Sequence, residues 1–214
     1  MALNPKLTYF STASPVIASY NYGDIASGEG YIVFQCFAAT SSTGISYHLT
    51  SSPLKSYPVE TFKDRLNNTS QTVTINFDSN PFALARTLKG TAEISVQFGS
   101  QDGGVGSAVS YLTITLQHWD GTTATNMGSV VTDTLTNTSD GWENINSMLL
   151  VPLTETHFAI GEMIRVKVEH FQNSIGVSNK DFYLSHDPLN AVAPSSALAG
   201  ETQFKINFPF KMDA

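Results

Sequence analysis

The sequence predicts an all-β protein, an antiparallel β-sandwich of the jelly-roll type, and three observations support this prediction. Apolar and polar residues alternate with a period of two in segments spread along the whole chain, which is typical of strands that bury one face. Clusters of Gly, Pro, Asp and Asn separate these segments. No segment predicts a long helix, and strands without helical crossovers pair in antiparallel sheets. Eight strands in two Greek keys is the common arrangement that fits.

The clearest segment is a predicted hairpin over residues 110–131. Its first strand directs three apolar side chains to one face, and these are Leu112, Ile114 and Leu116. It ends in Asp120-Gly121, a dipeptide that accepts the positive φ angles of a tight turn. A hairpin of this length needs a second layer to bury its apolar face.

The remaining elements follow the same pattern in chain order. Further strands are predicted at Gly30–Ala38, Ile45–Thr50, Gln71–Phe77, Thr91–Phe98, Gly161–Phe171 and Glu201–Met212, with an apolar run at Asn146–Leu153. The expected core side chains of the last two strands are Ile164, Val166, Val168, Phe204, Ile206 and Phe208. Short helical turns are predicted at Glu60–Leu66 and Thr154–Ile160. Pro209 cannot donate to a ladder, so it predicts an edge position or the end of pairing.

Two parts of the chain differ in pattern. Residues 29–214 are predicted to form a single sandwich domain, whereas residues 1–28 lack a hydrophobic period and predict an extended N-terminal arm. Such an arm buries too little of its own surface to offset its ordering entropy. Aromatic side chains suit anchoring, so the expected partner contacts are Tyr9, Phe10, Tyr20 and Tyr22. The alternative, that the arm packs on its own sandwich, stays open.

Composition narrows the function classes. Charged residues make up 14% of the chain, compared with about 25% in average domains. The net charge of −7 argues against direct binding of nucleic acid. No stretch reaches the roughly 18 apolar residues of a membrane span, and the N-terminus lacks the pattern of a secretory signal. We therefore expect no membrane partner, and synthesis and folding in a cytoplasm. Cys36 lies in an apolar run and is expected to be a buried small hydrophobe.

Motifs for catalysis or metal binding are weak. The five histidines do not form an H-E-x-x-H or another zinc pattern, and G-x-S-x-G is absent. Calcium at Asp120, Asp133 or Asp140 stays open, although no EF-hand spacing supports it. We therefore expect no enzymatic activity, no catalytic residue, no metal and no cofactor.

Two tryptophans adjoin predicted turns, at Trp119-Asp-Gly and Gly-Trp142-Glu. Exposed aromatic side chains on a sandwich can stack on sugars, so both are candidate ligand-stacking residues. The alternative is that they cap the open ends of the core. A shared exposed groove would favour sugar binding, and burial would weaken that interpretation.

Four segments, in their order along the chain, carry a resemblance to a known family. They are Ser19–Phe34, His118–Thr123 with Gly128-Ser129, Thr156–Val168, and His186-Asp-Pro188 followed by Phe204–Met212. Together they resemble the jelly-roll virion proteins of tailed bacteriophages, which include head decoration and minor capsid proteins. The resemblance implies a structural role and assembly as a homotrimer.

The expected function is thus that of a viral structural protein, a capsid decoration or cement protein on the exterior of the virion. Its expected partners are its own copies and the major capsid protein or other virion proteins. The acidic surface favours the outside of the head over the genome-facing interior. The alternative is a receptor- or carbohydrate-binding β-sandwich of a phage tail or fibre.

Overall fold

The computed structural model describes residues 29–41, 44–56, 61–102, 106–139, 141–176, 179–189 and 203–211. All regular secondary structure in these ranges is β. The described residues therefore contain no helix long and apolar enough to cross a membrane. The strands are β1 (Glu29–Ser41), β2 (Gly44–Thr50), β3 (Thr61–Asn67), β4 (Ser70–Asp78), β5 (Arg86–Asp102), β6 (Ser107–Trp119), β7 (Ala124–Val131), β8 (Leu135–Asn137), β9 (Trp142–Phe158), β10 (Met163–Ile175), β11 (Asn179–Ser185) and β12 (Lys205–Lys211). The prediction of an all-β sandwich is confirmed.

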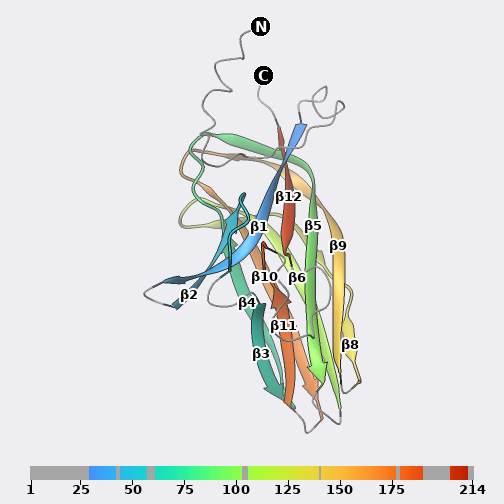
Figure 1. Ribbon diagram of the computed structural model, residues 1–214. Coiled ribbons are helices and arrows are strands. Elements are labelled where there is room, and N and C mark those ends of the chain that lie inside the picture. Colours follow the sequence, from blue (N-terminus) through green and yellow to red (C-terminus); the bar gives the residue numbers. More distant parts are fainter. Residues whose placement is uncertain are drawn as a thin grey trace.

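The strands form two layers around one core (Figure 1). The first layer has the order β3-β11-β5-β12-β1-β2, with β9 on the other edge of β5. The second layer has the order β4-β10-β6-β7, with β8 also paired to β6. A parallel bridge between His48 and Asp78 joins the layers, and the other ladders are antiparallel.

Strand β5 organises the first layer. Along one edge it pairs with β9 from Arg86 to Gln101. Its other edge is divided, because β12 pairs up to Ser95 and β11 pairs from Phe98 onward. Three strands from the second half of the chain, β9, β11 and β12, therefore meet on β5. Gln97 lies between the residues that pair with β12 and those that pair with β11.

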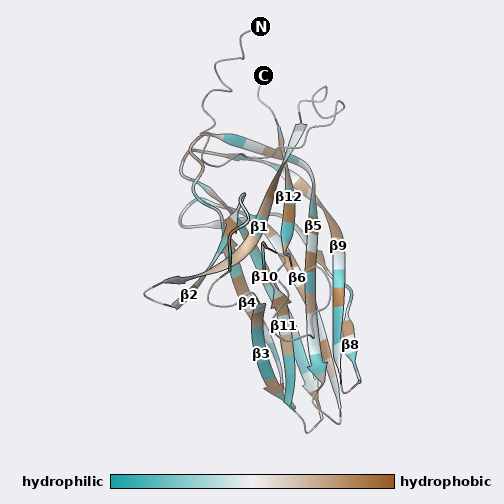
Figure 2. Ribbon diagram, viewed as in Figure 1, coloured by the Kyte–Doolittle hydropathy of each residue, from teal (hydrophilic) through white to brown (hydrophobic). Residues whose placement is uncertain are grey.

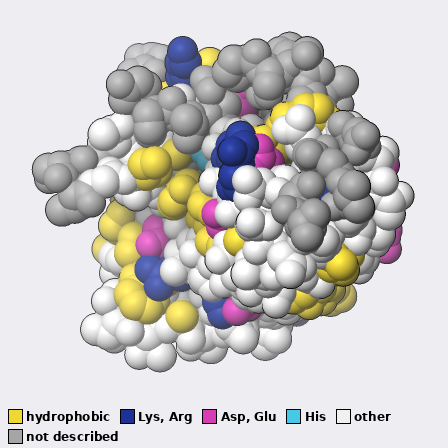
Figure 3. Space-filling view, turned by 90° about the horizontal axis from the view of Figure 1, so that it is seen from below, with side chains coloured by type: hydrophobic (Ala, Val, Ile, Leu, Met, Phe, Trp, Pro, Cys, Tyr) yellow, Lys and Arg dark blue, Asp and Glu magenta, His cyan; other side chains and the backbone are white. Residues whose placement is uncertain are grey.

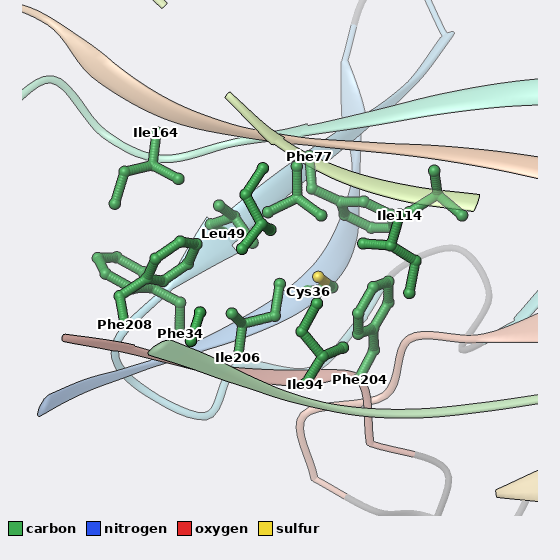
Figure 4. Packing of buried hydrophobic residues seen from close by; sticks show 14 of the residues in the cluster. Phe34, Cys36, Leu49, Phe77, Ile94, Ile114, Ile164, Phe204, Ile206 and Phe208 are labelled. Atoms are coloured by element: carbon green, nitrogen blue, oxygen red, sulfur yellow. The ribbon is translucent and has the colours of Figure 1, made fainter. Parts of the chain in front are cut away.

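The core lies between the layers, as the alternating colours in Figure 2 and the packed side chains in Figure 4 show. All nine core residues expected from the alternation are buried with 0% exposure: Leu112, Ile114, Leu116, Ile164, Val166, Val168, Phe204, Ile206 and Phe208. Cys36 is also fully buried, as predicted. Aromatic contacts cross between the layers, since Phe77 of β4 meets Phe204 edge-on at 5.6 Å between ring centroids.

The predicted hairpin is present as β6 and β7. Its turn is held by the Asp120 carboxylate, which accepts N–H bonds from Thr122 and Thr123 at 2.8 and 2.7 Å. These two backbone hydrogen bonds lower the pKa of Asp120, and the bond from Thr123 has the larger effect. Gly121 takes a φ of 98°, which favours glycine. The turn chemistry read from Asp120-Gly121 is therefore confirmed.

Two predicted helical turns are wrong. Residues 61–67 form β3, which pairs with β11 along its whole length, and residues 154–158 continue β9 along β5. In both cases ladder hydrogen bonds to a distant strand outweigh a weak local propensity. The glycine-rich segment between Phe98 and Ser110 also contributes to strands, since β5 extends to Asp102 and β6 begins at Ser107.

The expected edge position of Pro209 is wrong as well. Strand β12 lies between β1 and β5, and Pro209 pairs with Tyr31 of β1. On the β5 side the register shifts between Asn207 and Phe210, so the proline occupies an irregularity where no ladder donor is required. Gly90, with φ of 122°, lies against it, since an added Cβ there would be 3.2 Å from Pro209 Cβ.

Candidate ligand-binding face

The outer face of β3, β11, β5 and β9 presents a two-dimensional lattice of side chains, because every second residue of a strand points away from the core. Ladder pairing arranges these residues in rows across the strands. The rows are Arg65–Asp181–Gln101–Trp142, then Lys63–Tyr183–Gly99–Asn144, and then the pairs Thr61–Ser185 and Gln97–Asn146. We call five of these residues the aromatic–cation face: Lys63, Arg65, Trp142, Asp181 and Tyr183.

Trp142 and Tyr183 contact each other across β5. They come from β9 and β11, on either side of β5, and their ring centroids lie 4.4 Å apart. Gly99 leaves room for neighbouring groups, because an added Cβ would lie 2.5 Å from Asn144 Oδ1 and 2.7 Å from a backbone oxygen. Tyr183 is 4% exposed, whereas Trp142 is only partly buried. The tryptophan is thus the accessible part of the aromatic pair.

The Asp181 carboxylate collects the polar groups of the face. Arg65 donates to both of its oxygens, at 2.5 and 2.9 Å, and Lys63 Nζ lies 3.0 Å from Oδ2. The Tyr183 hydroxyl donates to Oδ2 at 3.3 Å. Burial acts to raise the pKa of Asp181, but the hydrogen bonds from Arg65 and Lys63 outweigh it and lower that pKa. Asp181 is therefore ionised at neutral pH.

The two cations stay accessible to solvent. The side chains of Lys63 and Arg65 are 49% and 60% exposed, while that of Asp181 is 6% exposed. Lys63 Nζ lies 5.2 Å from the centroid of the Tyr183 ring. Hydrogen bonding with Tyr183 is the largest cause of a raised Lys63 pKa. Two cations around one carboxylate leave one excess positive charge, on a chain whose net charge is −7.

Figure 3 shows basic side chains beside acidic ones at one end of the sandwich.

On the outer face of β5 and β11, Gln97 and Ser185 are fully buried. Both amide atoms of Gln97 and the Ser185 hydroxyl have no hydrogen-bond partner in the part of the chain that the structure describes.

Trp119, the second candidate stacking residue, lies on the other layer. The Arg165 guanidinium stands 3.8 Å from the centroid of its ring, and Arg165 also donates to both carboxylate oxygens of Asp78, at 2.6 and 2.8 Å. The ring therefore contacts a cation that a neighbouring strand holds in place. Because Trp119 and Trp142 lie on different layers, the shared groove that would have favoured sugar binding by both does not form.

The histidines are mostly engaged in the fold. His118 Nε2 lies 2.7 Å from Glu162 Oε2, which also accepts the Ala159 N–H at 2.6 Å and so fastens the turn before β10. His186 Nδ1 lies 3.2 Å from the Ser56 hydroxyl. Among the described residues, His, Cys, Asp and Glu do not gather in groups that could hold a metal ion.

A serine and a histidine do meet in the interior. Ser110 Oγ lies 2.7 Å from His170 Nε2, and His170 Nδ1 lies 3.1 Å from Gln172 Nε2. Gln71 donates its amide hydrogens to both Asp64 and Gln172 Oε1. The Gln172 amide nitrogen is therefore the donor to Nδ1, and Nε2 of the neutral ring carries the proton that bonds Ser110. This is the opposite of the arrangement in which a histidine accepts the proton of a serine nucleophile.

Sequence reasoning found Trp142 but missed its neighbours. A helical turn at Glu60–Leu66 would not have placed Lys63 and Arg65 side by side on one face, whereas a strand does. The alternation of Asp181 and Tyr183 was a signal that could have been read. The four other proposed contact residues, Tyr9, Phe10, Tyr20 and Tyr22, lie outside the described residues.

Comparison with known proteins leaves the family open. No family model matches the chain, and no curated protein matches it. Among solved structures, an α-amino acid ester hydrolase shares 10% identity with a TM-score of 0.52, over 84% of this chain and 36% of that chain. An aminopeptidase from a marine sediment Thaumarchaeota archaeon shares 8% identity with a TM-score of 0.50, over 83% and 36%. Infectious bursal disease virus (Gx strain) gives 10% identity and a TM-score of 0.34, over 82% and 40%.

These similarities correct one prediction. We excluded enzymes, and that exclusion is wrong because the fold of this chain recurs within proteins named as hydrolases. The chain spans about a third of the length of each of these two hydrolases, so most of each lies outside the match. At such low identity the similarity shows a shared fold.

Proposed function

We propose that this protein is a structural component of a virus particle that attaches to the exterior of a capsid and stabilises the lattice as a decoration or cement protein. The proposal rests on the end of the sandwich where residue 29 lies beside exposed apolar side chains, and we call this end the attachment pole. Glu29, the first described residue, pairs directly with Lys211, the last one, and Lys211 also pairs with Thr87 near the start of β5. Residues 1–28, the proposed arm, therefore connect to the sandwich at this pole.

The same pole exposes apolar side chains. Leu84 and Ile160 are 67% and 70% exposed. Their loops are tied together, because Phe82 donates its N–H to the Glu162 carbonyl and Gly161 donates to the Phe82 carbonyl, both at 2.9 Å. Exposed apolar groups at the end of a sandwich suit a protein–protein contact. The resemblance to phage virion proteins and the sandwich fold agree with this role.

The proposal includes a homotrimer, with major capsid protein as the second partner and the virion exterior as location. Its test is copurification with particles. Wild-type protein should remain on purified particles at a fixed copy number, and Leu84→Ser/Ile160→Ser should be released while keeping its melting temperature. A variant lacking residues 1–18 tests the arm in the same assay. Equal retention of all three proteins would contradict attachment through this pole.

A second candidate is a receptor- or carbohydrate-binding module of a tail or fibre. It is favoured by the aromatic–cation face, where a partly exposed tryptophan packs on Tyr183 and two exposed cations bind the neighbouring Asp181. Saccharide binding that is lost in Trp142→Ala but kept in Trp119→Phe would support it.

A further inference from the structure

We infer that the aromatic–cation face binds a saccharide that carries a carboxylate, such as a uronic or sialic acid. The inference rests on the second candidate function and adds the class of ligand. It starts from Trp142, whose ring is held against Tyr183 at 4.4 Å between centroids. A partly exposed ring that is fixed by packing offers a flat apolar surface with few torsions left to freeze. The C–H face of a sugar ring fits such a surface.

The carboxylate requirement comes from the two cations that surround Asp181 on the same face. Arg65 donates Nε and Nη2 to Asp181, so the carboxylate orients the guanidinium, which has further N–H donors. Because the Arg65 side chain is 60% exposed, those donors can meet a ligand carboxylate. Lys63 adds a second charge that is 49% exposed. Charge-assisted hydrogen bonds of this kind are stronger than neutral ones.

The charge of the face limits the charge of the anion that it can bind. Asp181 neutralises one of the two cations, so the face matches a ligand with isolated carboxylates. A polyphosphate would meet the repulsion of a chain with net charge −7. Asp181 keeps its charge at neutral pH because Arg65 and Lys63 lower its pKa, so the arrangement is present under ordinary conditions.

The experiment uses the two tryptophans as separate reporters. The chain has two tryptophans, so Trp119→Phe leaves Trp142 as the fluorophore and Trp142→Phe leaves Trp119. Each protein is titrated with sialyllactose and trigalacturonate, and with their neutral counterparts lactose and galactotriose. Emission of Trp142 should change saturably with an acidic saccharide, at an affinity about tenfold above that for the neutral counterpart. Emission of Trp119 should not change.

A charge variant and a salt series complete the test. Arg65→Gln should lower the affinity for the acidic saccharide about tenfold and leave the neutral one unaffected. Since this change also removes a partner of Asp181, its melting temperature is recorded. Added salt should weaken only acidic binding in the protein with Arg65 intact.

Two results would overturn the inference. Equal affinity for acidic and neutral saccharides would remove the carboxylate requirement and leave carbohydrate binding standing. No response of Trp142 to any of the four saccharides would overturn both the inference and the second candidate function, and would leave the attachment proposal untouched.

Discussion

The Nε2 atom of His170 lies 2.7 Å from the hydroxyl oxygen of Ser110, and the chain of amides behind the imidazole makes that nitrogen the hydrogen-bond donor. Both residues are fully buried between the layers. The pair therefore satisfies polar groups in the core, and a neutral His170 is part of the fold. Protonating this ring would place an additional hydrogen on Nδ1, where Gln172 already donates.

Stability should consequently fall in acid. Burial lowers the pKa of His170 to about 3 and that of His186 to about 4, below the ordinary value of 6.5. As pH falls below 6.5 the unfolded chain binds protons that the folded chain does not, so unfolding becomes easier until the folded pKa values are reached. For one histidine, a folded pKa that lies one pH unit below the unfolded pKa corresponds to about 1.4 kcal/mol of unfolding free energy. Urea unfolding between pH 7 and 3 measures the effect.

The matched control for this prediction is His157, which is exposed. His157→Gln should reproduce the wild-type dependence of unfolding free energy on pH, whereas His170→Gln should make that dependence shallower and leave the contribution of His186. A wild-type free energy that stays constant over this range would show that the buried rings do not resist protonation.

Replacing Gln97 with Met should stabilise the protein. Gln97 is fully buried and neither of its amide atoms has a partner in the described residues. Burying an unpaired amide costs on the order of 1–3 kcal/mol, and methionine has similar volume without that cost. The midpoint of urea unfolding should rise with an unchanged slope. A lower midpoint would indicate that the amide is satisfied in solution.

Adding one methyl group at Gly99 should disturb the aromatic–cation face. An added Cβ would come within 2.7 Å of the Glu143 backbone oxygen and 2.5 Å of Asn144 Oδ1, so β9 must shift. Gly99→Ala should cost about 1–3 kcal/mol of unfolding free energy. Gly141→Ala is the control, because its Cβ would meet its nearest neighbour at 3.7 Å. Equal stability of the two variants would refute this close packing.

Truncating Phe204 should be among the most damaging core changes. Its ring is fully buried and contacts Phe77 across the layers at 5.6 Å. Phe204→Ala should cost roughly 3–5 kcal/mol, measured by urea unfolding. Leu84→Ala, at a side chain that is 67% exposed, should change little. A small effect at Phe204 would mean that this end of the core collapses around the lost ring.

Local patterns in the sequence determined which face of many strands is buried. The alternation at Leu112, Ile114 and Leu116 predicted burial correctly, because the two-residue period of a strand acts within a single segment. The Asp120-Gly121 turn was predictable for the same reason. A side-chain carboxylate and a positive φ are properties of adjacent residues.

Tertiary structure alone decided which strands became neighbours. Lys63, Trp142 and Tyr183 belong to β3, β9 and β11, which share a face through their order and register around β5. Residues 61–67 show the same dependence, since pairing with β11 makes them a strand in place of the predicted helical turn. Ladder hydrogen bonds and cross-strand contacts form between segments far apart in the chain. The sequence could therefore predict a sandwich and one tryptophan of the candidate site, while long-range pairing assembled the face around it.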